Sequence, residues 1–136
     1  MKRFIAAAMF LALGTAAAAA QSPAGDATKG ANVFKKCMAC HAVGEGAKNK
    51  VGPELNGVIG RTMGAVADFN YSTTLQEHKT KGDVWSPEVL SAYLQNPRGY
   101  MPGIKMVFAG LPKDNDRADL IAYLSQFNAD GTKKAP

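Results

Sequence analysis

The pentapeptide Cys37-Met38-Ala39-Cys40-His41 constrains this chain more than any other feature, because it holds both cysteines of the sequence. Two thiols at this spacing can form thioethers with neighbouring vinyl groups of one porphyrin ring, and a histidine directly after them can supply an axial nitrogen to the iron. A chain that carries such a group folds around a large, flat, apolar cofactor. The motif therefore predicts one covalently bound haem c, attached at Cys37 and Cys40 and ligated by His41.

A cysteine pair could also form a structural disulfide, a thioredoxin-like redox site or half of a zinc site. A redox pair is expected inside a βαβ unit, and no stretch of this sequence alternates apolar and polar residues at period two. A zinc site needs a second pair of ligands, and the only other histidine is His78, on a polar stretch. The histidine that follows Cys40 distinguishes the pair from a disulfide, so haem attachment is the prediction.

Residues 1–20 are typical of a secretory signal peptide. Lys2 and Arg3 precede an apolar run from Phe4 to Leu13, and small residues follow up to Ala20. The apolar run is too short to cross a bilayer as a helix. We expect export to the bacterial periplasm, no stable membrane insertion, and one domain over residues 21–136. The net charge of +5 includes Lys2 and Arg3, and the remainder is too modest for nucleic-acid binding.

The hydrophobic periodicity predicts an all-α fold of four to five short helices. Capping residues mark the helix starts, most clearly in Ser86-Pro87-Glu88. Segments 42–72 and 97–113 are expected to be long loops with little regular structure, and packing against a haem would explain their length. Residues 133–136 should be frayed. Helices are expected over 26–37, 73–79 and 87–96, and from 114 or 116 to 127.

The sixth position of the iron decides between an electron carrier and a reactive centre, because a filled site leaves no place for a substrate or a gas. The candidate ligands are Met63, Met101, Met106 and His78. Met101 and Met106 lie in the stiff segment 96–106, which contains two prolines and two glycines. This segment is favoured to hold the ligand, but the residues alone do not separate its two methionines.

The sequence resembles the soluble class I cytochromes c, in particular the branch of mitochondrial cytochrome c and bacterial cytochrome c2. The resemblance extends from Gly30 to Leu124. In this family the ligand is the methionine after Pro-Gly-x-Lys, so the resemblance implies Met106. The matching motifs are Cys37 to His41, Val51-Gly52-Pro53, Gly60-Arg61, Phe69 with Tyr71, Trp85, Leu90 to Pro97, Pro102 to Met106, and Leu120 to Leu124.

The resemblance also implies roles for residues around the haem. The Pro53 carbonyl would accept the proton of His41, Arg61 and Trp85 with Tyr71 would serve the haem propionates, and Tyr93 would lie near the Met106 sulfur. The sequence departs from the mitochondrial pattern at Ile104, where Thr is usual, and near Leu75, where Asn is frequent. The segment between Tyr71 and Trp85 is also longer.

The function implied is that of a one-electron carrier, not an enzyme. We expect a monomer that shuttles between a bc1-type donor and a terminal acceptor, either an oxidase or a photosynthetic reaction centre. A basic surface around the haem edge, with Lys36, Arg98 and Lys105, would dock these membrane complexes. The alternatives are an electron acceptor dedicated to a periplasmic dehydrogenase and, with an open sixth site, a haem peroxidase or gas-binding protein.

Overall fold

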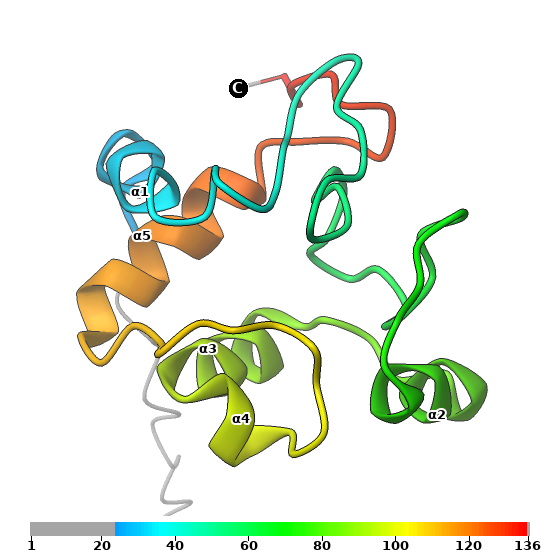
Figure 1. Cartoon of the computed structure of the whole chain (residues 1–136). Coiled ribbons are helices and arrows are strands. Elements are labelled where there is room, and N and C mark those ends of the chain that lie inside the picture. Colours follow the sequence, from blue (N-terminus) through cyan, green and yellow to red (C-terminus); the bar gives the residue numbers. More distant parts are fainter. Residues whose placement is uncertain (1–23, 136) are drawn as a thin grey trace, which may run out of the picture.

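The computed structural model describes residues 24–135 and builds them from short helices joined by long loops (Figure 1). No strand occurs within this range, where the only β pairing is two isolated bridges, Thr62 with Val84 and Phe127 with Lys133. The predicted all-α fold of four to five helices is confirmed, whereas the predicted signal peptide lies outside the described residues. The helices are α1 (Ala27–Phe34), α2 (Thr73–Lys81), α3 (Pro87–Gln95), α4 (Pro97–Tyr100) and α5 (Asp114–Leu124).

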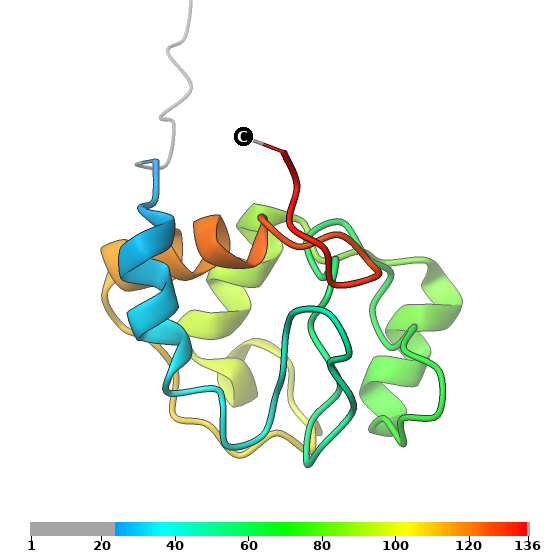
Figure 2. The same ribbon diagram turned by 90° about the horizontal axis from the view of Figure 1, so that it is seen from above.

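Helix α1 crosses α5 at very short range (Figures 1 and 2). The Asp26 side chain caps α1 by accepting from the amides of Thr28 and Lys29. A Cβ atom placed on Gly30 would lie 1.9 Å from the Asp119 carbonyl oxygen, and only a glycine allows that approach. Helix α1 ends at Phe34 and not near Cys37 as expected, because tighter turns take over, with the Cys37 amide donating to the Phe34 carbonyl at 2.8 Å.

Helix α3 packs against α5 and begins as its sequence predicts. The Ser86 hydroxyl accepts from the Val89 amide, and Pro87 occupies the first turn. The expectation of an irregular loop over 97–113 is wrong at its start, where α4 forms a single turn. The Asn96 side chain accepts from the Gly99 amide and so restarts the helix immediately after α3.

The C-terminal segment departs from two expectations. Helix α5 ends at Leu124 and not at Phe127, because the amides of Gln126 and Phe127 donate to carbonyls only three residues back and tighten the chain. The tail is not frayed at its start, since Phe127 bridges with Lys133 and the Lys134 amide donates to the Gln126 carbonyl at 2.8 Å.

Helix α2 stands apart from the other helices (Figures 1 and 2) and contacts none of them within residues 24–135. The buried Ser72 caps its start, and Gly82 ends it with a left-handed φ of 77°. None of its residues is buried. No helix in the described part of the chain has the length and apolar character that a membrane span requires.

Candidate haem site

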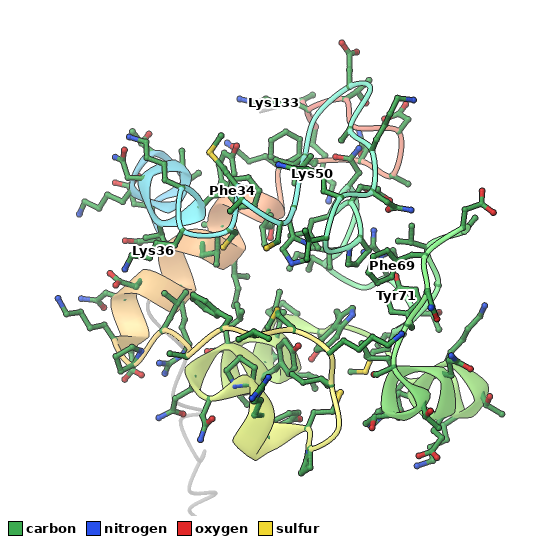
Figure 3. The ribbon with its side chains drawn as sticks, in the orientation of Figure 1. Phe34, Lys36, Lys50, Phe69, Tyr71 and Lys133 are labelled. Atoms are coloured by element: carbon green, nitrogen blue, oxygen red, sulfur yellow. The ribbon has the colours of Figure 1, made fainter. Side chains whose placement is uncertain are left out.

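The loops and helices enclose a cavity of about 460 Å³ with mostly apolar walls. In Figure 3, Phe34 and Lys36 lie on one side of this region, and Phe69 and Tyr71 lie on the opposite side. Several of the lining residues also belong to the buried core, so a ligand in the cavity would complete that core. The apolar lining includes Phe34, Leu55, Val58, Phe69, Leu75, Leu90, Leu94, Phe108, Leu120 and Leu124.

The attachment motif lines one wall of this cavity. Cys37 and Cys40 are half-buried free thiols and are not joined as a disulfide. The amides of Cys40 and His41 both donate to the Cys37 carbonyl, at 3.1 and 2.9 Å, so a single turn sets the spacing of the three side chains. Burial raises the pKa of the Cys37 thiol, and the charge of Lys36 partly opposes this effect.

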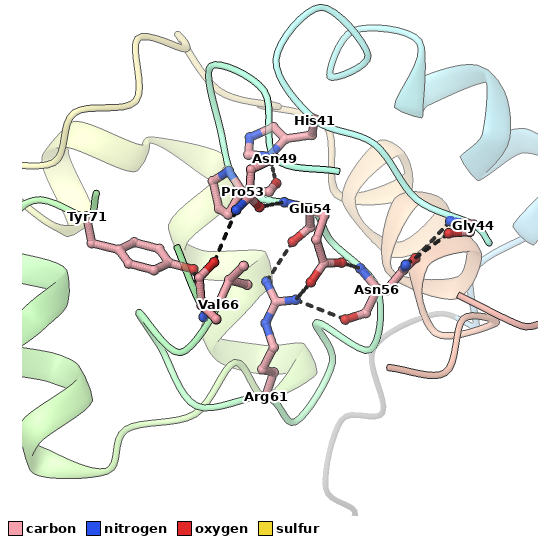
Figure 4. A network of polar contacts seen from close by, with 10 residues as sticks. His41, Gly44, Asn49, Pro53, Glu54, Asn56, Arg61, Val66 and Tyr71 are labelled. Carbon is pink, nitrogen blue, oxygen red and sulfur yellow. Dashed lines mark hydrogen bonds and ion pairs between the residues drawn. The ribbon is translucent and has the colours of Figure 1, made fainter. Parts of the chain in front are cut away.

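His41 is held in one orientation by the loop that faces it (Figure 4). Its Nδ1 atom lies 2.7 Å from the Pro53 carbonyl oxygen, which fixes the proton on Nδ1 and leaves Nε2 as a ligand atom. A Cβ on Gly52 would lie 2.4 Å from the imidazole Cε1, so only a glycine leaves room for the ring. Burial lowers the pKa of His41, which favours the neutral imidazole that binds metals.

Of the candidate sixth ligands, Met106 alone lines the cavity. Met101 and Met63 are almost fully buried in the core, 2% and 3% exposed. His78 Nδ1 lies 2.6 Å from an Asp83 carboxylate oxygen. Within residues 24–135, no cluster of three His, Cys, Asp or Glu side chains could hold a separate metal ion.

Tyr93 approaches the Met106 thioether from α3. Its hydroxyl lies 3.9 Å from the Met106 sulfur, within range for a weak hydrogen bond to sulfur. Burial raises the pKa of Tyr93 to about 12, so the hydroxyl keeps its proton at neutral pH. The Tyr93 ring packs against Trp85 with ring centroids 4.9 Å apart, and both line the cavity.

Arg61 and Tyr71 line the cavity beside a polar network (Figure 4). Arg61 donates to the carbonyl oxygens of Asn56 at 2.9 Å and Glu54 at 3.0 Å, and it pairs with the Glu54 carboxylate at 3.3 Å. Burial lowers the pKa of Arg61, and Glu54 partly restores it. The Tyr71 hydroxyl accepts from the Val66 amide at 3.2 Å, so its own proton can serve another acceptor.

Sequence reasoning missed Glu54 as the carboxylate that neutralises and orients Arg61. The only signal available is its position directly after Pro53, and an acidic residue in an irregular loop has no periodic pattern to mark it. The pairing needs the folded loop 53–61, which brings the two side chains together.

The predicted docking residues are not all at the cavity. Lys36 and Lys105 line it, whereas Arg98 lies on α4 and does not. The Lys105 ammonium donates to the Asn70 carbonyl at 2.9 Å, and Lys36 lies 4.0 Å from the Asp116 carboxylate. Two lining residues, Val51 and Val107, are 79% and 83% exposed and mark the open side of the cavity.

Comparison with known proteins identifies the family to which this chain belongs. Residues 27–128 match the family model described as Cytochrome c. The chain is 75% identical over 105 residues to cytochrome c-550 of Ancylobacter novellus, across 77% of this chain and 98% of that protein. The chain belongs to the cytochrome c family. It is also 46% identical over 134 residues to cytochrome c2 of Blastochloris viridis, across 98% of this chain and 100% of that protein.

A solved structure supports the same assignment. Cytochrome c2 from Rhodospirillum centenum matches with a TM-score of 0.73 and 44% sequence identity, across 76% of this chain and 99% of that chain. The predicted resemblance to the bacterial cytochrome c2 branch is therefore confirmed. The protein is a monohaem electron carrier with one covalently bound haem c.

The residues of the cavity fit this cofactor. Two unpaired thiols, an imidazole with Nε2 available, a thioether and an apolar wall occur together, and Gly52 leaves room for the imidazole ring. When bound, the haem supplies an iron that changes between ferrous and ferric states and so stores one electron. The apolar walls would exclude water from the ring and so raise the cost of the additional positive charge in the ferric state.

Proposed function

We propose that this protein is a periplasmic electron shuttle whose iron is closed on both sides, by His41 and Met106. The observation that carries this proposal is that Met106 alone, among the four candidate sixth ligands, lines the cavity that holds the attachment motif. A centre with both axial positions filled exchanges electrons without exchanging ligands, and it offers no site to peroxide or to a gas.

The roles of the surrounding residues follow from their contacts. Pro53 orients His41, and Tyr93 donates to the Met106 sulfur. Arg61, Tyr71 and Trp85 lie on the cavity wall, where they would offer N–H and O–H donors to the propionates of the haem. Buried carboxylates need such donors, so these residues would keep the propionates ionised within the protein.

The shuttle would accept electrons from a bc1-type complex and deliver them to an oxidase or a photosynthetic reaction centre. Lys36 and Lys105 beside the exposed Val51 and Val107 provide a basic rim around an apolar centre, which suits a transient contact with an acidic docking surface. Arg98 on α4 would extend this rim. A monomer suits a carrier that must leave each partner quickly.

The ligand assignment is tested by replacing each loop methionine in the haem-loaded protein. Met106→Ala should abolish the weak far-red absorption band of the ferric iron–thioether bond and should allow carbon monoxide to bind the ferrous iron at neutral pH. Met101→Ala removes a buried side chain from the same loop and should keep the band. Retention of the band in Met106→Ala would contradict ligation by Met106, and rapid carbon monoxide binding by the unaltered protein would contradict a closed iron.

The proposed partners are tested with membranes from the host. The reduced protein should be oxidised by membranes that contain the terminal acceptor, and the rate should fall as ionic strength rises. Reduction by a purified periplasmic dehydrogenase, without exchange with bc1-containing membranes, would instead favour a dedicated acceptor.

A further inference from the structure

Helix α2 packs against the core through one partly buried apolar side chain, Leu75. It buries no residue, and it contacts no other helix in the described part of the chain. On one side its backbone approaches Gly64, where a Cβ would lie 2.8 Å from the Leu75 carbonyl oxygen. Two hydrogen bonds also join the segment 70–74, at the start of α2, to the loop that carries Met106.

The first of these bonds comes from a side chain of α2. The Thr74 hydroxyl donates to the Pro102 carbonyl at 3.0 Å, across 28 residues of sequence. The second runs in the opposite direction, since the Lys105 ammonium donates to the Asn70 carbonyl at 2.9 Å. The segments 70–74 and 102–105 are therefore joined at both ends, and Met106 follows directly.

The backbone of the loop passes unusually close to the threonine hydroxyl. Gly103 has a φ of +88°, and a Cβ placed on it would lie 2.7 Å from Thr74 Oγ1. The Pro102–Gly103 turn therefore lies in direct contact with the Thr74 side chain. No residue from Pro102 to Met106 carries a side-chain hydroxyl, and position 104 is occupied by the buried Ile104.

We propose that Thr74 is a positioning residue for Met106, and that its hydroxyl holds the loop 102–106 closed over the haem cavity. The proposal rests on the proposed ligation by Met106. Thr74 would not contact the iron. It holds the Pro102 carbonyl in place, and because the chain turns at Gly103 directly afterwards, the position of Pro102 limits where the Met106 thioether can lie. Loss of the hydroxyl raises the fraction of time for which the loop is open and the sixth position is free.

The test uses imidazole as an external ligand for the ferric, haem-loaded protein, because imidazole can bind only when the thioether has left. Thr74→Val removes the hydroxyl and keeps the β-branch, so the fold should be retained. One net hydrogen bond corresponds to an increase of about two- to tenfold in the rate and affinity of imidazole binding. Thr74→Ser should restore the unaltered values.

Thr73→Val is the matched control, since Thr73 lies beside Thr74 in the first turn of α2 and is exposed. It should bind imidazole as the unaltered protein does. Amide hydrogen exchange provides a second measurement, in which the amides of residues 103–106 should exchange faster in Thr74→Val only.

The two proposals fail in different ways. The role of Thr74 would be overturned if Thr74→Val and Thr73→Val bound imidazole equally and their loop amides exchanged at equal rates. Ligation by Met106 would then still stand. Absence of the iron–thioether band from the unaltered protein would overturn ligation by Met106 and the role of Thr74 with it.

Discussion

At the scale of single residues, the Tyr93 hydroxyl would tune the iron through the sulfur of Met106, its proposed ligand. The Tyr93 hydroxyl lies 3.9 Å from that sulfur and keeps its proton, because burial raises the pKa of Tyr93 to about 12. A donor to the thioether withdraws electron density from the iron, which stabilises the ferrous state. With Met106 as the ligand, the contact would therefore raise the reduction potential without a change of ligands.

Tyr93→Phe should lower the midpoint potential, because the ferric state gains a more electron-rich sulfur. A weak hydrogen bond of about 0.5–1 kcal/mol corresponds to a shift of about 20–40 mV for a one-electron couple. Since the tyrosine stays protonated well above neutral pH, the shift should be the same from about pH 6 to about pH 9. Redox titration measures it, and Tyr123→Phe, which changes a tyrosine outside the cavity, is the control. An unchanged potential in Tyr93→Phe would show that the hydroxyl does not act on the sulfur.

At the scale of elements, local sequence chemistry predicted where helices begin better than where they end. Ser86 caps α3 as its sequence pattern predicts, and Asp26 and Ser72 cap α1 and α2 in the same way. Helix α5 ends where the amides of Gln126 and Phe127 donate to carbonyls three residues back, and α4 depends on the Asn96 side chain. These are tertiary or single-residue events that leave no periodic signal.

The crossing of α1 and α5 reverses the usual effect of alanine in a helix. Helix propensity alone predicts that Gly30→Ala stabilises the protein by about 1 kcal/mol. The new Cβ would lie 1.9 Å from the Asp119 carbonyl oxygen and 2.7 Å from the Tyr123 Cβ, so the helices must separate. We expect a net loss of about 2 kcal/mol or more, as for overpacked cores.

Chemical denaturation of the haem-loaded protein measures this loss. Asn32→Ala, at an exposed position of the same helix, is the control and should change stability by less than about 0.5 kcal/mol. If Gly30→Ala were as stable as the unaltered protein, the close crossing would not limit the residue at this position.

At the scale of the whole molecule, the cavity draws on almost the entire described chain, from Phe34 to Leu124. Sequence reasoning predicted the family, the fold and the cofactor, because the attachment motif and the order of the other motifs are local patterns. It could not choose between Met101 and Met106 from the residues alone, since both lie in one irregular loop. The fold separates them by burying Met101 in the core while Met106 lines the cavity.

The arrangement of charge around the cavity mouth gives the last prediction. Lys36 lines the cavity, and its side chain is 58% exposed, whereas Lys81 is exposed at the end of α2 and does not line it. Lys36→Gln and Lys81→Gln remove the same charge, so any difference between them reports position and not net charge. At low ionic strength, Lys36→Gln should slow electron transfer with host membranes by about two- to fivefold, the range of one exposed ion pair.

Lys81→Gln should have a smaller effect on the same rate. The difference between the variants should vanish near 1 M salt, where the Debye length is only about 3 Å. The measurement is the second-order rate constant for oxidation of the reduced protein across a series of ionic strengths. Equal slowing by both variants would mean that the partner responds to the overall charge, and that the basic rim at the cavity does not direct docking.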